Sequence, residues 1–194
     1  MRRQLTLQQY RDIDLFFFGV MLLISECVIH GAIRWFPGEL YTVSVVGAMV
    51  TIVLMRWGSF AAVHALLGGG IYCFLSHATG KQYLIYCIGN LLALSTLLLF
   101  KVWDKERIRG DTARTVIFAL CVQLLMWVGR GVTALILGAD PATCFGFFTT
   151  DALSGVFTVV IVWIARRLDG IFEDQNHYLL RLHRAEEEEK GGSQ

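Results

Sequence analysis

The chain lacks the short motifs that mark common enzymes and ATP-driven pumps. Its 194 residues contain no Walker sequence for nucleotide binding and no His-Glu-x-x-His pair for zinc. Its serines are not set as the nucleophile of an intramembrane protease, and no positioned base accompanies them. These absences predict a protein that is not an enzyme, that uses no cofactor and that hydrolyses no ATP by itself.

Paired cysteines are also missing. The five cysteines are an odd number and show no Cys-x-x-Cys spacing. Four of them lie in apolar stretches, where a free cysteine behaves as a small hydrophobic residue. We therefore predict neither a disulfide nor a metal site from Cys27, Cys73, Cys87, Cys121 and Cys144.

Charge is scarce, whereas apolar residues are abundant and grouped. Charged residues make up 17% of the chain, the formal net charge is +1, and no basic patch indicates nucleic-acid binding. The apolar residues, 55% of the total, form six stretches separated by short loops. Each stretch is close to the ~20 residues that cross a bilayer as a helix. The stretches are residues 15–33, 40–55, 57–75, 83–100, 116–137 and 149–165.

The basic residues alternate from side to side of this arrangement. Fourteen of the 17 Lys and Arg residues fall on one side, Arg34 and Lys81 fall on the other, and Arg130 lies within a span. Because basic residues stay in the cytoplasm, both termini are expected inside. The sequence predicts an all-α membrane protein, a bundle of six transmembrane helices with N-in/C-in topology. Fusing residues 40–75 into one helix is disfavoured, because it would bury Arg56.

The chain divides at residue 165. Residues 1–165 form the predicted transmembrane domain, and residues 166–194 form a cytoplasmic segment. That segment is predicted to begin with an amphipathic helix on the inner leaflet and to end in a solvated acidic tail, AEEEEKGGSQ. The helix is inferred from apolar residues at helical spacing, which are Leu168, Ile171 or Phe172, Leu179 and Leu182.

Small residues recur at four-residue spacing in the third stretch. Ala61, Ala65 and Gly69 would let another helix approach closely, because packing drives helix association in lipid. The neighbour is either a helix of this chain or a helix of a partner subunit.

Polar residues inside the apolar stretches are the candidate binding site. Charged or amide side chains are costly in a membrane and are usually functional. Arg130 lies about seven residues, or roughly 10 Å, below the outer end of its span. Five others from four spans fall in the same outward half of the bundle, and the six candidates are Glu26, Asn90, Gln123, Trp127, Arg130 and Asp151.

Two interpretations of this polar layer stay open. In the first, Arg130 pairs with Glu26 or Asp151 and the cluster only orients helices. In the second, the planar guanidinium of Arg130 binds an anionic or carbonyl group of a ligand from outside. Trp127, together with Tyr83 and Tyr86, would then supply aromatic walls.

Two sequence segments resemble a known family of membrane proteins. Residues 45–72, VVGAMVTIVLMRWGSFAAVHALLGGGIY, and residues 83–94, YLIYCIGNLLAL, are similar to helices two to four of the S component of energy-coupling factor (ECF) transporters. Size, topology and the missing ATPase motif agree with this resemblance. The family often carries an Ala-x-x-x-Ala pattern on its first helix, and here Ala61 and Ala65 supply that spacing instead.

The resemblance implies a high-affinity substrate-capturing subunit for a vitamin or other small micronutrient. It also implies a bacterial plasma-membrane location, lipid neighbours, and partners in the form of a T-type membrane subunit with two ABC ATPases. The implied pocket positions match by helix and depth at Asn90, Gln123, Trp127, Arg130 and Asp151, and Glu26 joins them from the polar layer alone. The alternative from another class is a membrane-embedded scaffold or assembly protein with no transported ligand.

The predicted topology can be tested by cysteine labelling on intact cells. Single cysteines at Gly38, Gly80 and Gly110, in a background without native cysteines, are treated with an impermeant thiol reagent. We expect labelling at Gly38 and Gly80 only, because Gly110 belongs to an inner loop. Labelling at Gly110, or silence at both other sites, contradicts N-in/C-in topology.

Overall fold

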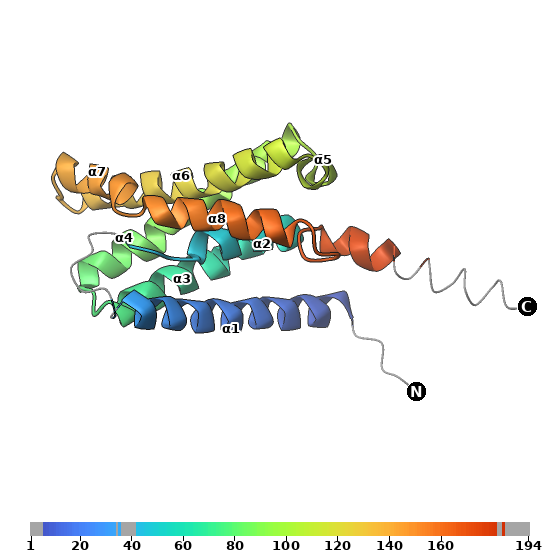
Figure 1. Cartoon of the computed structure of the whole chain (residues 1–194), viewed down its shortest axis with the longest axis horizontal. Helices are drawn as coiled ribbons and strands as arrows, with labels where there is room; N and C mark the ends of the chain where they lie inside the picture. The colour runs from blue at the N-terminus through green and yellow to red at the C-terminus, as the bar shows by residue number, and fades with distance from the viewer. Residues whose placement is uncertain (1–5, 34, 36–41, 182–183, 185–194) are drawn as a thin grey trace, which may run out of the picture.

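The computed structural model describes residues 6–33, 35, 42–181 and 184, and in this part of the chain it is all-helical, without strands (Figure 1). Eight α-helices and two 3-10 segments with assigned bounds follow one another here. They are α1 (Leu7–Ile33), α2 (Val46–Trp57), η1 (Gly58–Phe60), α3 (Ala61–Leu75), α4 (Gly80–Asn90), η2 (Leu91–Lys101), α5 (Lys105–Gly110), α6 (Thr112–Ile136), α7 (Pro141–Thr149) and α8 (Ala152–Ala165).

Five helical runs within the described residues are long and apolar enough to cross a membrane. Their lengths of 22 to 30 residues exceed the ~20 residues that the hydrocarbon core requires. The chain therefore has the make-up of a multi-pass membrane protein. The runs are Leu7–Ile33, Val46–Leu75, Gly80–Lys101, Thr112–Ile136 and Pro141–Ala165.

The run from Val46 to Leu75 is folded back on itself. Gly58, at the end of α2, has a φ of +60°, a conformation that glycine adopts without steric cost. A Cβ placed on Gly68 in α3 would lie 2.4 Å from Cγ1 of Val46, the first residue of α2. Helices α2 and α3 thus lie side by side as a hairpin. The sequence placed a break at residue 56, and the structure turns the chain two residues later.

Two short helices occupy segments that the sequence analysis treated as loops. Helix α7 starts after Asp140, whose carboxylate accepts hydrogen bonds from the backbone N–H of Thr143 (2.9 Å) and from its hydroxyl (2.7 Å). Pro141 takes the first helical position, where its missing N–H costs nothing. Helix α5 is held by Ile108, which is fully buried. In the sequence, the pair Asp140-Pro141 indicates the start of α7.

The closest helix contact joins α4 to α6. A Cβ on Gly129 would lie 2.0 Å from the carbonyl oxygen of Gly89, and a Cβ on Gly89 would lie 2.6 Å from Cα of Arg130. Only glycine at both positions allows this approach of two backbones. The contact sets Arg130 directly beside Asn90, the residue that follows Gly89.

The small-residue stripe is covered by this chain. Ala61 and Ala65 are fully buried, and a Cβ on Gly69 would lie 2.8 Å from the backbone of Tyr86 in α4. The side-chain amide of Asn90 donates to the carbonyl oxygen of Ala65 (3.2 Å). The stripe therefore packs against helices of this chain, which is the first of the two neighbours considered from the sequence, and a partner-subunit interface at Ala61, Ala65 and Gly69 stays an untested prediction.

A buried ion pair joins the first half of α1 to the end of α2. The guanidinium of Arg56 donates to both carboxylate oxygens of Asp14 in α1 (2.7 and 2.8 Å), and the indole of Trp57 donates to the same carboxylate (2.6 Å). Arg56 also donates to the carbonyl oxygens of Gly170 and Ile171. Arg56 was expected to be exposed in a loop, but it is buried because the segment after α8 covers it.

The segment after α8 differs from the expected helix. The chain leaves helical geometry after Ala165, turns at Gly170 with a φ of +69°, and is helical again at residues 175–181. Phe172 is fully buried, whereas Leu168 is half exposed. A continuous amphipathic helix from residue 166 is therefore wrong. Leu182 and the acidic tail, residues 185–194, lie outside the described residues.

The basic residues gather at one end of the bundle. The start of α1, the helix α5 and the end of α8 lie together, while α7 and the start of α4 lie at the other end (Figure 1).

Burial raises the pKa of Asp174 near α5, but the hydrogen bond from Lys105 (2.6 Å), the lysine charge and two backbone N–H groups outweigh it, so that this pKa is lowered from its ordinary value. Helix α5 and the C-terminal segment are thereby joined.

The α4–α6 contact predicts a strong effect of one added methyl group. Gly129→Ala should lower the free energy of unfolding by about 1–3 kcal/mol, because neither backbone can withdraw without strain. Gly131→Ala, two residues along the same helix, is the matched control, since the nearest atoms to its Cβ would be 3.8 Å away. Thermal unfolding of both purified variants measures the difference. Equal melting temperatures would contradict the packing.

Candidate functional site

Asp151, just before α8, is the centre of the polar layer. Its Oδ2 atom accepts hydrogen bonds from Nη1 of Arg130 (2.8 Å) and from the indole N–H of Trp127 (2.7 Å). Its Oδ1 atom accepts from the hydroxyls of Ser154 and of Thr42, the latter at 3.3 Å. The carboxylate is thus bonded from α6, from α8 and from the segment before α2.

Arg130 has two further partners in α4. Its Nε atom donates to Oδ1 of Asn90 (2.8 Å), and its guanidinium carbon lies 4.7 Å from the ring centre of Tyr86. The side chains of Arg130 and Asp151 are each 5% exposed. A buried charge needs both an opposite charge and further hydrogen bonds, and Arg130 has both.

The third nitrogen of the Arg130 guanidinium, Nη2, differs from Nε and Nη1. Within the described residues no hydrogen bond involves this atom. Among the described residues, Nδ1 of His64 is the one side-chain nitrogen or oxygen that is both fully enclosed and without a hydrogen bond. Nη2 of Arg130 also has no hydrogen bond, so it must be partly accessible. Nη2 therefore keeps two donors that a ligand could use.

Glu26 belongs to the same layer, but it does not contact Arg130. Its Oε1 atom accepts hydrogen bonds from the hydroxyl of Ser44 (2.9 Å) and from the backbone N–H of Val45 (2.8 Å). A carboxylate here satisfies a buried backbone donor at the start of α2 and complements the helix dipole. The backbone N–H of Ser44 donates to the hydroxyl of Ser154 (2.8 Å), so among the described residues two serines link Glu26 to Asp151.

Gln123 lies two turns deeper along α6. Its side-chain oxygen accepts from the hydroxyl of Thr158 in α8 (3.0 Å) and would be 1.9 Å from a Cβ on Gly47. It therefore joins α6, α8 and α2 by polar contact and close packing. Of the six residues chosen from the sequence, Asn90, Trp127, Arg130 and Asp151 form one bonded cluster, while Glu26 and Gln123 lie at its edges.

Aromatic rings surround the cluster at the α7 end. Tyr86 stacks on Tyr72 with ring centres 4.7 Å apart and meets the edge of Phe147 from α7. Trp127 packs against Phe148 at 5.7 Å. Helix α7 thus lies over the cluster as an aromatic cover. Tyr83, expected among these walls, is half-buried, and no ring contact of Tyr83 is found among the described residues.

Sequence reasoning missed the hydroxyl groups of the site. Thr42, Ser44, Ser154 and Thr158 all bond to residues of the polar layer. Serine and threonine are too common in membrane helices to stand out singly. A usable sign was Ser154 three residues after Asp151, because this spacing places both on one side of a helical turn.

The arrangement holds one buried arginine against one buried carboxylate. No group of three or more His, Cys, Asp or Glu side chains that could hold a metal lies within the described ranges. The class that fold and site define is an all-helical, multi-pass membrane protein with a buried polar layer near one end. Comparison of the chain with protein-family models, with curated proteins and with solved structures finds no match.

The Arg130–Asp151 pair predicts a coupled effect on stability. Asp151→Ala leaves a buried guanidinium without its counter-charge and should cost about 3–5 kcal/mol of unfolding free energy, and Arg130→Ala should cost a similar amount. The double variant should lose less than the sum, because no charge is then stranded. Thermal unfolding of the four proteins measures the coupling. Strict additivity would mean that the two residues do not interact.

Proposed function

We propose that this protein is the substrate-capturing membrane subunit of an ECF-type importer for a small micronutrient. The observation that carries the proposal is the buried cluster of Arg130, Asn90, Trp127 and Asp151 beneath aromatic rings. A small-molecule site in a membrane protein needs a few fixed polar groups among aromatic walls, and this cluster supplies both.

In this proposal the unbonded Nη2 donors of Arg130 hold the ligand. An anionic or carbonyl oxygen receives charge-assisted hydrogen bonds from them, while Asn90 and Asp151 fix the plane of the guanidinium. Tyr86, with Tyr72 stacked on it, supports the other face of the guanidinium or of a ring in the ligand. Movement of α7 would open the aromatic cover to the outside.

The proposed topology has six crossings. Counting α2 and α3 as two crossings of a hairpin turns the five apolar runs into six. The start of α1 and the segment after α8 then lie on the cytoplasmic side of a bacterial membrane together with the basic helix α5, in line with the positive-inside rule. The ligand site faces outward near α7. Import would use an external energising module, a T-type subunit with two ABC ATPases.

A second candidate function is a membrane-embedded scaffold without a transported ligand. The observation that favours it is the Arg130–Asp151 ion pair itself, which is complete without any ligand. In that case the polar layer fixes the register of α4, α6 and α8. Buried ion pairs are known to serve such specificity.

Substitution of Arg130 separates the two functions. Native mass spectrometry of protein purified from its host identifies any co-purified small molecule, and that compound is then the titration probe. Arg130→Lys keeps a point charge for Asp151 but loses the planar fork. If Arg130 binds ligand, the variant should still fold, with only a small fall in melting temperature from the lost bond to Asn90, and should bind about 10- to 150-fold more weakly, since one lost donor is worth ~1.5–3 kcal/mol.

The matched control is Arg114→Lys at the opposite end of α6, where the guanidinium meets Asp111 at the surface. It should leave both the Kd and the melting temperature unchanged. A large fall in the melting temperature of Arg130→Lys with unchanged affinity would refute the binding role. Absence of any co-purified molecule, together with that fall, would favour the scaffold.

A further inference from the structure

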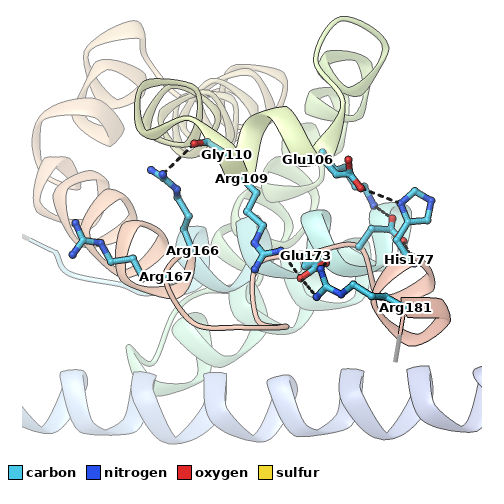
Figure 2. Close-up of a pocket in the computed structure, with 10 residues that line it drawn as sticks. Glu106, Arg109, Gly110, Arg166, Arg167, Glu173, His177 and Arg181 are labelled. Atoms are coloured by element: carbon cyan, nitrogen blue, oxygen red, sulfur yellow. Dashed lines mark hydrogen bonds and ion pairs between the residues drawn. The ribbon is translucent and has the colours of Figure 1, made fainter. Parts of the chain in front are cut away.

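A cavity lies at the basic end of the molecule, at the opposite end of α8 from Asp151. Its volume is about 550 Å³, and it lies between α5, the end of α8 and the C-terminal segment (Figure 2). Ten residues line it, and nearly all are charged or polar: Lys105, Glu106, Arg109, Gly110, Arg166, Arg167, Glu173, Asp174, His177 and Arg181.

The cavity carries more positive than negative side chains. Five cationic residues face three carboxylates around it. Arg109 and Arg181 converge on Glu173, at 2.5 and 3.1 Å (Figure 2). Lys105 pairs with Asp174 at 2.6 Å. These pairs use up the carboxylates on the C-terminal side of the cavity.

Two arginines of the cavity have no carboxylate partner among the described residues. The guanidinium of Arg166 donates to neutral acceptors, the carbonyl oxygen of Gly110 (3.3 Å) and the hydroxyl of Thr112. The guanidinium of Arg167 lies 3.9 Å from the ring centre of Trp163. Within the described part of the chain, neither makes an ion pair. Figure 2 shows both on the α8 side of the cavity, apart from the Glu173 cluster.

The cavity lies at the depth where apolar helices end. Arg166 and Arg167 directly follow α8, and Thr112 begins α6 next to Gly110. Trp163 beside Arg167 is typical of the interface between hydrocarbon and headgroups. On α8 just before this point, Val160 and Ile164 are 46% and 48% exposed, so acyl chains have apolar surface to lie against.

We propose that this cavity binds the phosphate of an anionic phospholipid headgroup. Arginine forks match phosphate oxygens, and basic pockets between membrane helices on the cytoplasmic side suit acidic lipids. The position at the ends of two apolar helices favours a lipid over a soluble phosphate. A bound lipid would tie α8 to α5 and hold the C-terminal segment over Arg56. This site does not depend on a transported ligand, and its cytoplasmic position rests on the proposed topology.

Native mass spectrometry of the full-length protein in detergent tests the lipid site. The probe is phosphatidylglycerol, with phosphatidylcholine as the neutral lipid of equal chain length. We expect one preferentially retained phosphatidylglycerol per protein. The double variant Arg166→Gln/Arg167→Gln should weaken this binding about 30-fold, at roughly 5-fold for each arginine near the surface.

Arg107→Gln is the matched control, because Arg107 lies in the same helix α5 but does not line the cavity. The control variant should retain phosphatidylglycerol as the unchanged protein does. In phosphatidylcholine, both variants should have the melting temperature of the unchanged protein. Equal retention in the double variant and the control would overturn the proposal.

A third measurement adds inorganic phosphate at millimolar concentration as a competitor. Displacement of the lipid by phosphate alone, or stabilisation by phosphate without lipid retention, would make the site one for a soluble anion.

Discussion

The ion pair between Arg130 and Asp151 is the constraint on which the described bundle depends. A guanidinium and a carboxylate that are each 5% exposed are stable only while they hold each other and their other partners. Their bonds reach α4 through Asn90 and the segment before α2 through Thr42. Displacing α8 from α6 would therefore leave both charges unpaired, and displacing α4 would remove the bond from Asn90 to the guanidinium. The glycine contact between α4 and α6 is what brings the pair and Asn90 within bonding distance.

Under the proposed function, the same pair determines how a ligand is recognised. A complete ion pair keeps the empty site stable, so a ligand must gain its affinity from the Nη2 donors and from the aromatic rings rather than from relief of a bare charge. Ligands with one anionic oxygen and a flat ring suit this arrangement best. A stronger anion would compete with Asp151 and pull Arg130 from Asn90, which would couple binding to the packing of α4 against α6.

Periodicity and composition predicted the all-helical architecture and the residues of the polar layer, because burial in lipid strongly limits where Arg130, Asn90 and Asp151 can stand. They did not predict α7 as a helix, although Asp140 at the N-cap and Pro141 at the first helical position are typical of a helix start. The segment after Ala165 was misjudged because Gly170 permits a turn that apolar spacing does not reveal. Which carboxylate pairs with Arg130 depends on tertiary distance, and no pattern within one helix contains that information.

Helix α1 is joined to the bundle by polar contacts near both of its ends. Asp14 holds Arg56 and Trp57 at the end of α2, and Glu26 holds Ser44 and Val45 at its start. The two carboxylates are about 18 Å apart along the helix, and sliding α1 by one turn would break both contacts together. The length of hydrocarbon that α1 spans is thereby fixed. In a thinner or thicker bilayer the lipid must deform or the whole bundle must tilt, because this helix cannot adjust its depth alone.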